Sequence, residues 1–105
     1  MNWNIVFLPE ASNDLSKLDG SVRYQVFKGI RKVSQNPLPK SSGGYGKPLG
    51  NDLSGLMKIK FRKIGIRVVY KVEMVQNVMK IIIVSARADN QVYEEAEKRR
   101  IKHKL

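Results

Sequence analysis

Two lysines stand two positions apart in a segment whose residues alternate between polar and apolar. Lys58 and Lys60 flank Ile59 in the stretch 56–62, and the alternation predicts a strand. Side chains at i and i+2 of a strand point to the same face about 7 Å apart, which suits two cations to gripping one phosphodiester. An ordinary polar outer face of a half-buried strand has the same pattern, so the spacing alone leaves both interpretations open.

Three further residues of suitable chemistry follow along the chain. Arg67 lies just across a tight turn predicted at 63–65, close enough to share the face of the two lysines. Arg87 comes directly after an apolar strand, in a loop of the kind that commonly holds functional groups. Tyr93 follows six residues later in the last predicted helix, where it serves the site or packs that helix.

The positive charge of the chain is concentrated in its middle. Lysine and arginine total 20 against 9 acids, and the net charge is +11. Residues 21–71 hold twelve of the basic residues and one acid, Asp52, so this stretch carries the whole net charge. Such a field attracts polyanions, although a solvated basic surface has the same composition. We expect RNA phosphates to bind the basic residues of the helix at 21–35 and of the following hairpin: Arg23, Lys28, Arg31, Lys32, Arg62 and Lys63.

The composition argues against several classes of site. The chain has no cysteine, and its carboxylates and lone histidine show no metal-binding spacing, so we expect neither a metal nor a cofactor. The glycine-rich stretch 41–46 lacks the spacing of a phosphate-binding loop. His103 lies in a basic tail and is predicted to be solvated. Neither a secretion signal nor a membrane span is recognisable, which predicts a cytoplasmic protein without membrane contact.

The periodicity of apolar residues predicts the elements that position these groups. The solid apolar run in the last strand predicts burial on both faces, at the centre of the sheet. Proline and glycine mark 36–55 as an irregular, mobile loop, anchored by Tyr45 or Leu49. Asp89 or Asn90 can cap the final helix. The predicted elements are a strand at 2–8, helices at 9–18 and 21–35, strands at 56–62, 66–74 and 78–85, and a helix at 91–100.

This order of elements, β-α-α-β-β-β-α, predicts an α+β fold. We expect a mainly antiparallel sheet with the two N-terminal helices packed on one face and a short C-terminal helix. A chain of 105 residues has room for one hydrophobic core, so we expect a single domain over 1–105.

Two segments of the chain resemble the RelE/ParE superfamily of toxins. The stretch 57–72, MKIKFRKIGIRVVYKV, is similar to that family's central hairpin of paired lysines, a glycine turn and arginine followed by Val-Tyr. The stretch 85–96, SARADNQVYEEA, is similar to its closing segment, and 8–18 fits its first strand and helix. The resemblance covers essentially the whole chain and implies a RelE-like fold. Met57 departs from a frequent tyrosine, and Ala86 stands where a further basic residue can occur.

The resemblance also implies an activity. RelE-type ribonucleases cut mRNA in the ribosomal A site, without a metal, by attack of a ribose 2′-hydroxyl on its own 3′-phosphate, and so inhibit translation. On this resemblance Lys60 is the base, and Arg87 donates a proton or stabilises the leaving group. Tyr93 stacks on or orients the nucleotide, and Tyr93 as the base is the alternative. Arg67 and Lys58 are the best candidates for stabilising the phosphate charge, since fixed cations act most strongly where charge develops. The implied catalytic set is Lys58, Lys60, Arg67, Arg87 and Tyr93.

The resemblance implies macromolecular partners. They are the ribosome with its mRNA and a cognate antitoxin, expected to be acidic and partly disordered. Gyrase-poisoning ParE members share the fold but generally lack the full basic and tyrosine set. A ParE-type gyrase inhibitor without nuclease activity and a non-catalytic RNA-binding module are the alternative functions.

Overall fold

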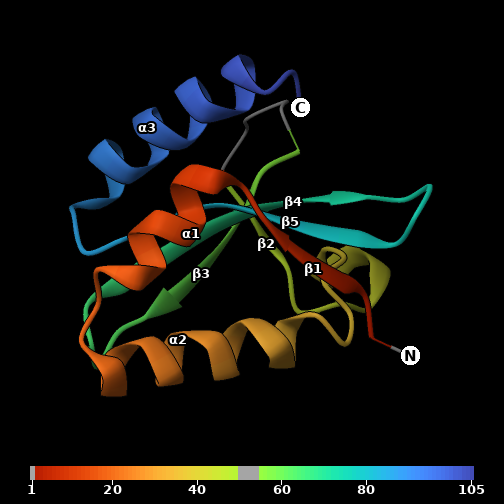
Figure 1. Cartoon of the computed structure of the whole chain (residues 1–105). Helices are drawn as coiled ribbons and strands as arrows, with labels where there is room; N and C mark the ends of the chain where they lie inside the picture. The colour runs from red at the N-terminus through yellow and green to blue at the C-terminus, as the bar shows by residue number, and fades with distance from the viewer. Residues whose placement is uncertain (1, 50–54) are drawn as a thin grey trace.

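The computed structural model describes residues 2–49 and 55–105, and its elements follow the predicted order with one short strand added (Figure 1). The helices are α1 (Pro9–Ser16), α2 (Gly20–Val33) and α3 (Asp89–Lys102), with a 3-10 turn η1 (Lys40–Ser42). The strands are β1 (Asn4–Phe7), β2 (Lys47–Pro48), β3 (Met57–Phe61), β4 (Ile66–Glu73) and β5 (Val78–Ser85). The predicted α+β class is confirmed. No helix within 2–49 or 55–105 is long and apolar enough to cross a membrane.

The strands form a mixed sheet in the order β1-β5-β4-β3-β2. Neighbours from β5 to β2 pair antiparallel, and only the β1–β5 pair among the described strands is parallel, so the expected mainly antiparallel sheet is confirmed. Strand β4, and not β5, is the middle strand. Strand β5 is nevertheless buried on both faces as predicted, with Ile81, Ile82, Ile83 and Val84 almost inaccessible.

Helices α2 and α3 lie on opposite sides of β4 and β5 (Figure 1). On one face, Gly29 of α2 lies so close to Phe61 of β3 that an added Cβ would lie 2.3 Å from the ring. On the other face, Tyr93 of α3 lies over Lys58 of β3. Helix α1 packs mainly against β5. The lysine-bearing face of β3 is therefore the face that α3 covers.

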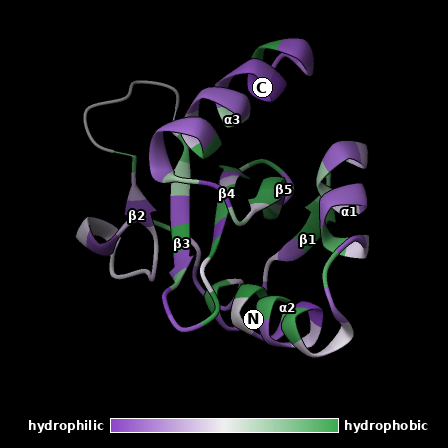
Figure 2. Ribbon diagram, turned by 90° about the vertical axis from the view of Figure 1, so that its left-hand side faces the viewer, coloured by the Kyte–Doolittle hydropathy of each residue, from purple (hydrophilic) through white to green (hydrophobic). Residues whose placement is uncertain are grey.

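The core is built from the apolar stripes that the periodicity marks. Val26 and Ile30 of α2 are fully buried, and Val22 and Val33 of the same predicted stripe are partly buried against them. Figure 2 shows β5 in the hydrophobic colour between helices with mixed surfaces. Helix α3 is largely hydrophilic and contributes Val92 and Ala96 to the core. Its position therefore depends more on polar contacts than that of α2 does.

The segment predicted as a mobile loop is partly regular. Its described part contains η1 and β2, and the Tyr70 hydroxyl donates a hydrogen bond of 2.8 Å to the carbonyl of Pro37. Leu49 is buried and anchors the segment beside the core. This burial agrees with the predicted anchor Leu49, whereas the other predicted anchor, Tyr45, is exposed. The short elements η1 and β2 were not predicted, because local contacts are not visible in composition. Gly50 and Asp52 lie outside the described residues.

Helix α3 begins earlier and ends later than predicted. Ala88 is its N-cap residue, with extended backbone and no side-chain cap, and Asp89 is the first helical residue. The prediction that Asp89 or Asn90 caps this helix was therefore wrong. The carboxylate of Asp89 turns instead to the cations of the sheet, where it finds charged donors.

Candidate active site

The register of β3 and β4 brings three predicted site residues to one face. Lys60 is paired opposite Arg67, and Lys58 is paired opposite Val69. Residues paired across antiparallel strands project to the same side, and so do Lys58 and Lys60 at i and i+2. Gly65, with a φ of 67°, makes the tight turn between the strands. The hairpin thus presents Lys58, Lys60 and Arg67 together beneath the start of α3.

A carboxylate joins two of these cations. Lys60 Nζ lies 2.8 Å from Asp89 Oδ2, and Arg67 Nε donates to Asp89 Oδ1. The hydrogen bond from Lys60, helped by Arg67, holds the pKa of the Asp89 carboxyl below its ordinary value. Arg67 Nη1 also donates to the Arg87 carbonyl at 2.9 Å, so the guanidinium is fixed at two points.

Tyr93 covers the other end of the lysine pair. Lys58 Nζ lies 5.8 Å from the centre of its ring, within cation–π range. The Tyr93 hydroxyl is buried and has no hydrogen-bond partner among the described residues. Burial raises its pKa above the ordinary value of about 10, and the nearby Asp89 charge acts in the same direction. The hydroxyl therefore stays protonated at neutral pH.

Arg87 contacts one of the other four residues, Arg67, through its backbone and not through its side chain. Its backbone N–H donates to Ser85 Oγ at 3.1 Å, and its carbonyl holds Arg67. Its exposed guanidinium makes no hydrogen bond or ion pair within the described chain, and it lines a hollow of about 230 Å³ with Glu95 and Arg99. The structure thus gathers four of the five predicted residues and leaves the fifth side chain at the edge.

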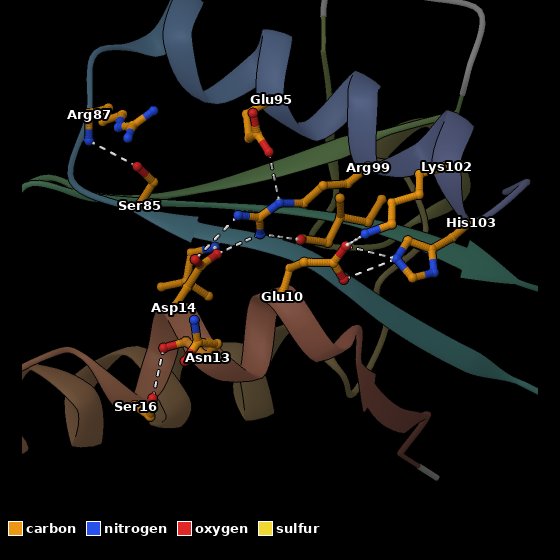
Figure 3. A network of polar contacts seen from close by, with 12 residues as sticks. Glu10, Asn13, Asp14, Ser16, Ser85, Arg87, Glu95, Arg99, Lys102 and His103 are labelled. Atoms are coloured by element: carbon orange, nitrogen blue, oxygen red, sulfur yellow. Dashed lines mark hydrogen bonds and ion pairs between the residues drawn. The ribbon is translucent and has the colours of Figure 1, made fainter.

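Polar contacts to α1 fix the helix that carries Tyr93 (Figure 3). Arg99 Nη1 lies 2.7 Å from Asp14 Oδ2 and donates to the Ile82 carbonyl at 3.0 Å. Nearer the end of α3, Lys102 and His103 both reach Glu10, each at 3.0 Å. Hydrogen bonds from His103 and Lys102 lower the pKa of Glu10 to about 2. His103 is therefore a docked residue, and the prediction that it is solvated was wrong.

A hollow opens next to the paired cations. It measures about 230 Å³ and is lined by Lys60, Phe61, Arg62, Ile66 and Arg67 together with the turn glycine. Its mixture of cations and an aromatic ring suits a nucleotide adjoining a bound phosphate. No group of three or more histidine, aspartate or glutamate side chains that could hold a metal occurs in 2–49 or 55–105.

A second basic surface lies on the outer side of α2. A hollow of about 390 Å³ there is lined by Lys28, Arg31 and Lys32 together with exposed Tyr24 and Phe27. The other residues predicted to bind RNA are also exposed: Arg23 near the start of α2, and Arg62 and Lys63 in the β3–β4 turn. Cations interleaved with aromatic side chains are typical of surfaces that bind nucleic-acid strands.

Sequence reasoning missed Asp89 as a member of the site. The available signal was its position between Arg87 and Tyr93, both predicted site residues. Its place before an apolar helical pattern favoured a capping role instead.

Comparison with known proteins places this architecture among toxins. A mutant of the E. coli toxin RelE in the free state superposes with a TM-score of 0.76 and 31% identity, over 94% of this chain and 98% of that one. A chain of the intact E. coli RelBE toxin–antitoxin complex gives 0.68 and 28% identity, over 82% and 98%. An E. coli protein described as a RelE-like toxin is 29% identical over 99 residues, which are 94% of this chain and 98% of that protein. No family model matches the sequence.

Proposed function

This chain belongs to the RelE family of toxins from toxin–antitoxin pairs, and we propose that it is a ribosome-dependent endoribonuclease that cuts mRNA in the ribosomal A site. The observation that carries the proposal is the gathering of Lys58, Lys60, Arg67 and Tyr93 on one face of the sheet. Three cations and an aromatic ring match what an RNA phosphate and its base require.

The proposed reaction is an intramolecular transesterification. The ribose O2′ attacks the adjacent phosphorus, the P–O5′ bond breaks, and the products are a 2′,3′-cyclic phosphate and a 5′-hydroxyl. One proton passes from O2′ to the base, and the departing O5′ takes one proton from solvent water. The site must therefore supply a base, charge stabilisation at the phosphate, and help for the leaving oxygen.

The geometry supports a particular division of these tasks. Arg67 and Lys58 stabilise the developing phosphate charge, because fixed cations act most strongly where charge develops. Lys60 takes the O2′ proton. Tyr93 is the poorer candidate for the base, because its hydroxyl is buried, and its ring stacks on the nucleotide. Arg87, exposed and unpaired within the described chain, turns toward O5′ and stabilises the leaving group.

The basic surface on α2 and the β3–β4 turn supplies the proposed contact with the ribosome. Phosphate contacts position a protein on RNA without reading sequence, which suits a toxin that meets many messages. The ribosome would hold the message in a bent form that the site itself cannot impose. This role places the protein in the cytoplasm, where translation takes place.

The proposed partner that silences the toxin is an antitoxin. Relatives have been crystallised as RelBE toxin–antitoxin complexes. A chain with a net charge of +11 fits an acidic, partly disordered partner that orders on binding.

Translation and gyrase assays run in parallel test this proposal. The purified protein should stop a reconstituted translation reaction and leave DNA supercoiling by gyrase unchanged. Arg67→Gln should be weaker in the translation assay by about 10²-fold or more, since it removes a fixed cation from the phosphate. Lys98→Gln, the same loss of charge at an exposed site on α3, should match the wild type. Gyrase inhibition with unaffected translation would overturn the proposal in favour of a ParE-type toxin.

A further inference from the structure

The carboxylate of Asp89 contacts two of the side chains to which the proposed reaction assigns the RNA. Its two oxygens are divided between two cations: Oδ2 faces Lys60 Nζ at 2.8 Å, and Oδ1 accepts from Arg67 Nε. A phosphodiester also presents two anionic oxygens, and lysine and arginine bind carboxylates and phosphates by the same charge-assisted hydrogen bonds. The two anions therefore compete for the same donors.

The arrangement around Asp89 favours this internal occupant. Arg67 Nη1 is committed to the Arg87 carbonyl at 2.9 Å, which aims Nε at the carboxylate. Asp89 is the first residue of α3, where the helix dipole stabilises a negative charge. Helix α3 is itself held through Arg99 and Asp14, so the carboxylate stays near its donors at high effective concentration.

We propose that Asp89 is a specificity-determining residue that fills the phosphate position of the free toxin and must be displaced by RNA. Displacement frees Lys60 Nζ and Arg67 Nε from the carboxylate, so that both groups face the bound RNA. Free RNA binds more weakly because of this competition. A message held by the ribosome brings its phosphate to the site at high local concentration and displaces the Asp89 carboxylate. This inference rests on the proposed function and adds the reason why the site discriminates against free RNA.

The test measures binding of a short RNA that cannot be cut. A fluorescent oligonucleotide with 2′-O-methyl groups at every position lacks the attacking hydroxyl, so anisotropy reports affinity alone. Asp89→Asn should bind it about fivefold more tightly than the wild type, because the amide no longer competes with the RNA phosphate as an anion for Lys60 and Arg67. Glu94→Gln, which removes one negative charge from an exposed site on the same helix, should change affinity less than about twofold.

A second background separates competition from a general change of charge. When Lys60→Gln has removed one of the shared donors, adding Asp89→Asn should give less than half of its original gain. Asp89→Ser provides a second substitution compatible with a helix start. Equal gains from Asp89→Asn and Glu94→Gln, or an undiminished gain in Lys60→Gln, would overturn the inference. Binding requires no cleavage, so competition without any cut of ribosome-bound mRNA would uphold the inference while refuting the proposed activity.

Discussion

At the scale of single residues, Tyr93 offers two chemically different contributions. Its ring lies over Lys58, whereas its hydroxyl is buried without a partner in the described chain. Burial raises the hydroxyl pKa, so deprotonation at neutral pH is disfavoured. The ring is therefore the part of Tyr93 that we expect to serve catalysis.

Tyr93→Phe, which keeps the ring, should retain single-turnover cleavage of ribosome-bound mRNA to within about fivefold, with an unchanged pH profile. Tyr93→Ala should be slower by about 10- to 10²-fold, because stacking on a base is worth about 1–3 kcal/mol. The melting temperature of Tyr93→Phe should not fall, since the lost hydroxyl makes no hydrogen bond. If Tyr93→Phe is as slow as Tyr93→Ala, the hydroxyl takes part in the reaction.

The residues of the site were predictable to different degrees. Lys58, Lys60 and Arg67 share a face because strand alternation and a short turn fix their directions, and both features are visible in the sequence. The direction of the Arg87 side chain was not predictable. Arg87 follows the last strand in a loop, and the path of that loop depends on tertiary contacts. Asp89 was misread as a cap because local sequence does not show which distant cations meet a helix start.

At the scale of elements, the position of α3 controls the geometry of the site. This helix carries both Asp89 and Tyr93, yet it buries only Val92 and Ala96 completely among its described residues. The ion pair between Arg99 and Asp14 connects it to α1 at largely buried positions, with side-chain exposures of 13% and 17%. Asp14 also accepts the backbone N–H of Val84 at 3.1 Å, so the pair ties two helices to β5.

Arg99→Ala should lower the free energy of unfolding by about 2–3 kcal/mol, because it leaves the largely buried Asp14 carboxylate without its ion pair. Lys98→Ala, at the neighbouring exposed position on α3, is the matched control and should change stability by less than about 0.5 kcal/mol. Urea denaturation followed by circular dichroism measures both. Equal effects of the two substitutions would show that the Arg99 contact does not hold α3.

The sequence indicated most elements but not all of their pairings. Alternation identified β3, a solid apolar run identified β5, and the short turns on either side of β4 made the antiparallel pairing of these three strands predictable. Hydropathy does not identify the neighbour of an isolated strand, so the parallel pairing of β1 with β5 was not foreseen. Strand β2 is two residues long and contains Pro48, which gives too little pattern to detect.

At the scale of the whole molecule, most acidic residues form ion pairs with cations of the same chain, and these pairs leave the basic surface exposed. Six acidic residues form ion pairs within the described chain, and none of these pairs involves a cation of α2. The unpaired cations on α2 and on the β3–β4 turn thus remain available to a polyanion. On the proposed function, the molecule combines an RNA-anchoring surface with a site whose cations are already paired with the Asp89 carboxylate.

Primer extension on an mRNA incubated with the purified protein, with and without programmed ribosomes, tests the central claim most directly. We expect cuts within the ribosome-occupied A-site codon that are seen only when ribosomes are present and are lost in Arg87→Ala. Equally rapid cutting of the naked message, or an undamaged message under both conditions, would contradict it.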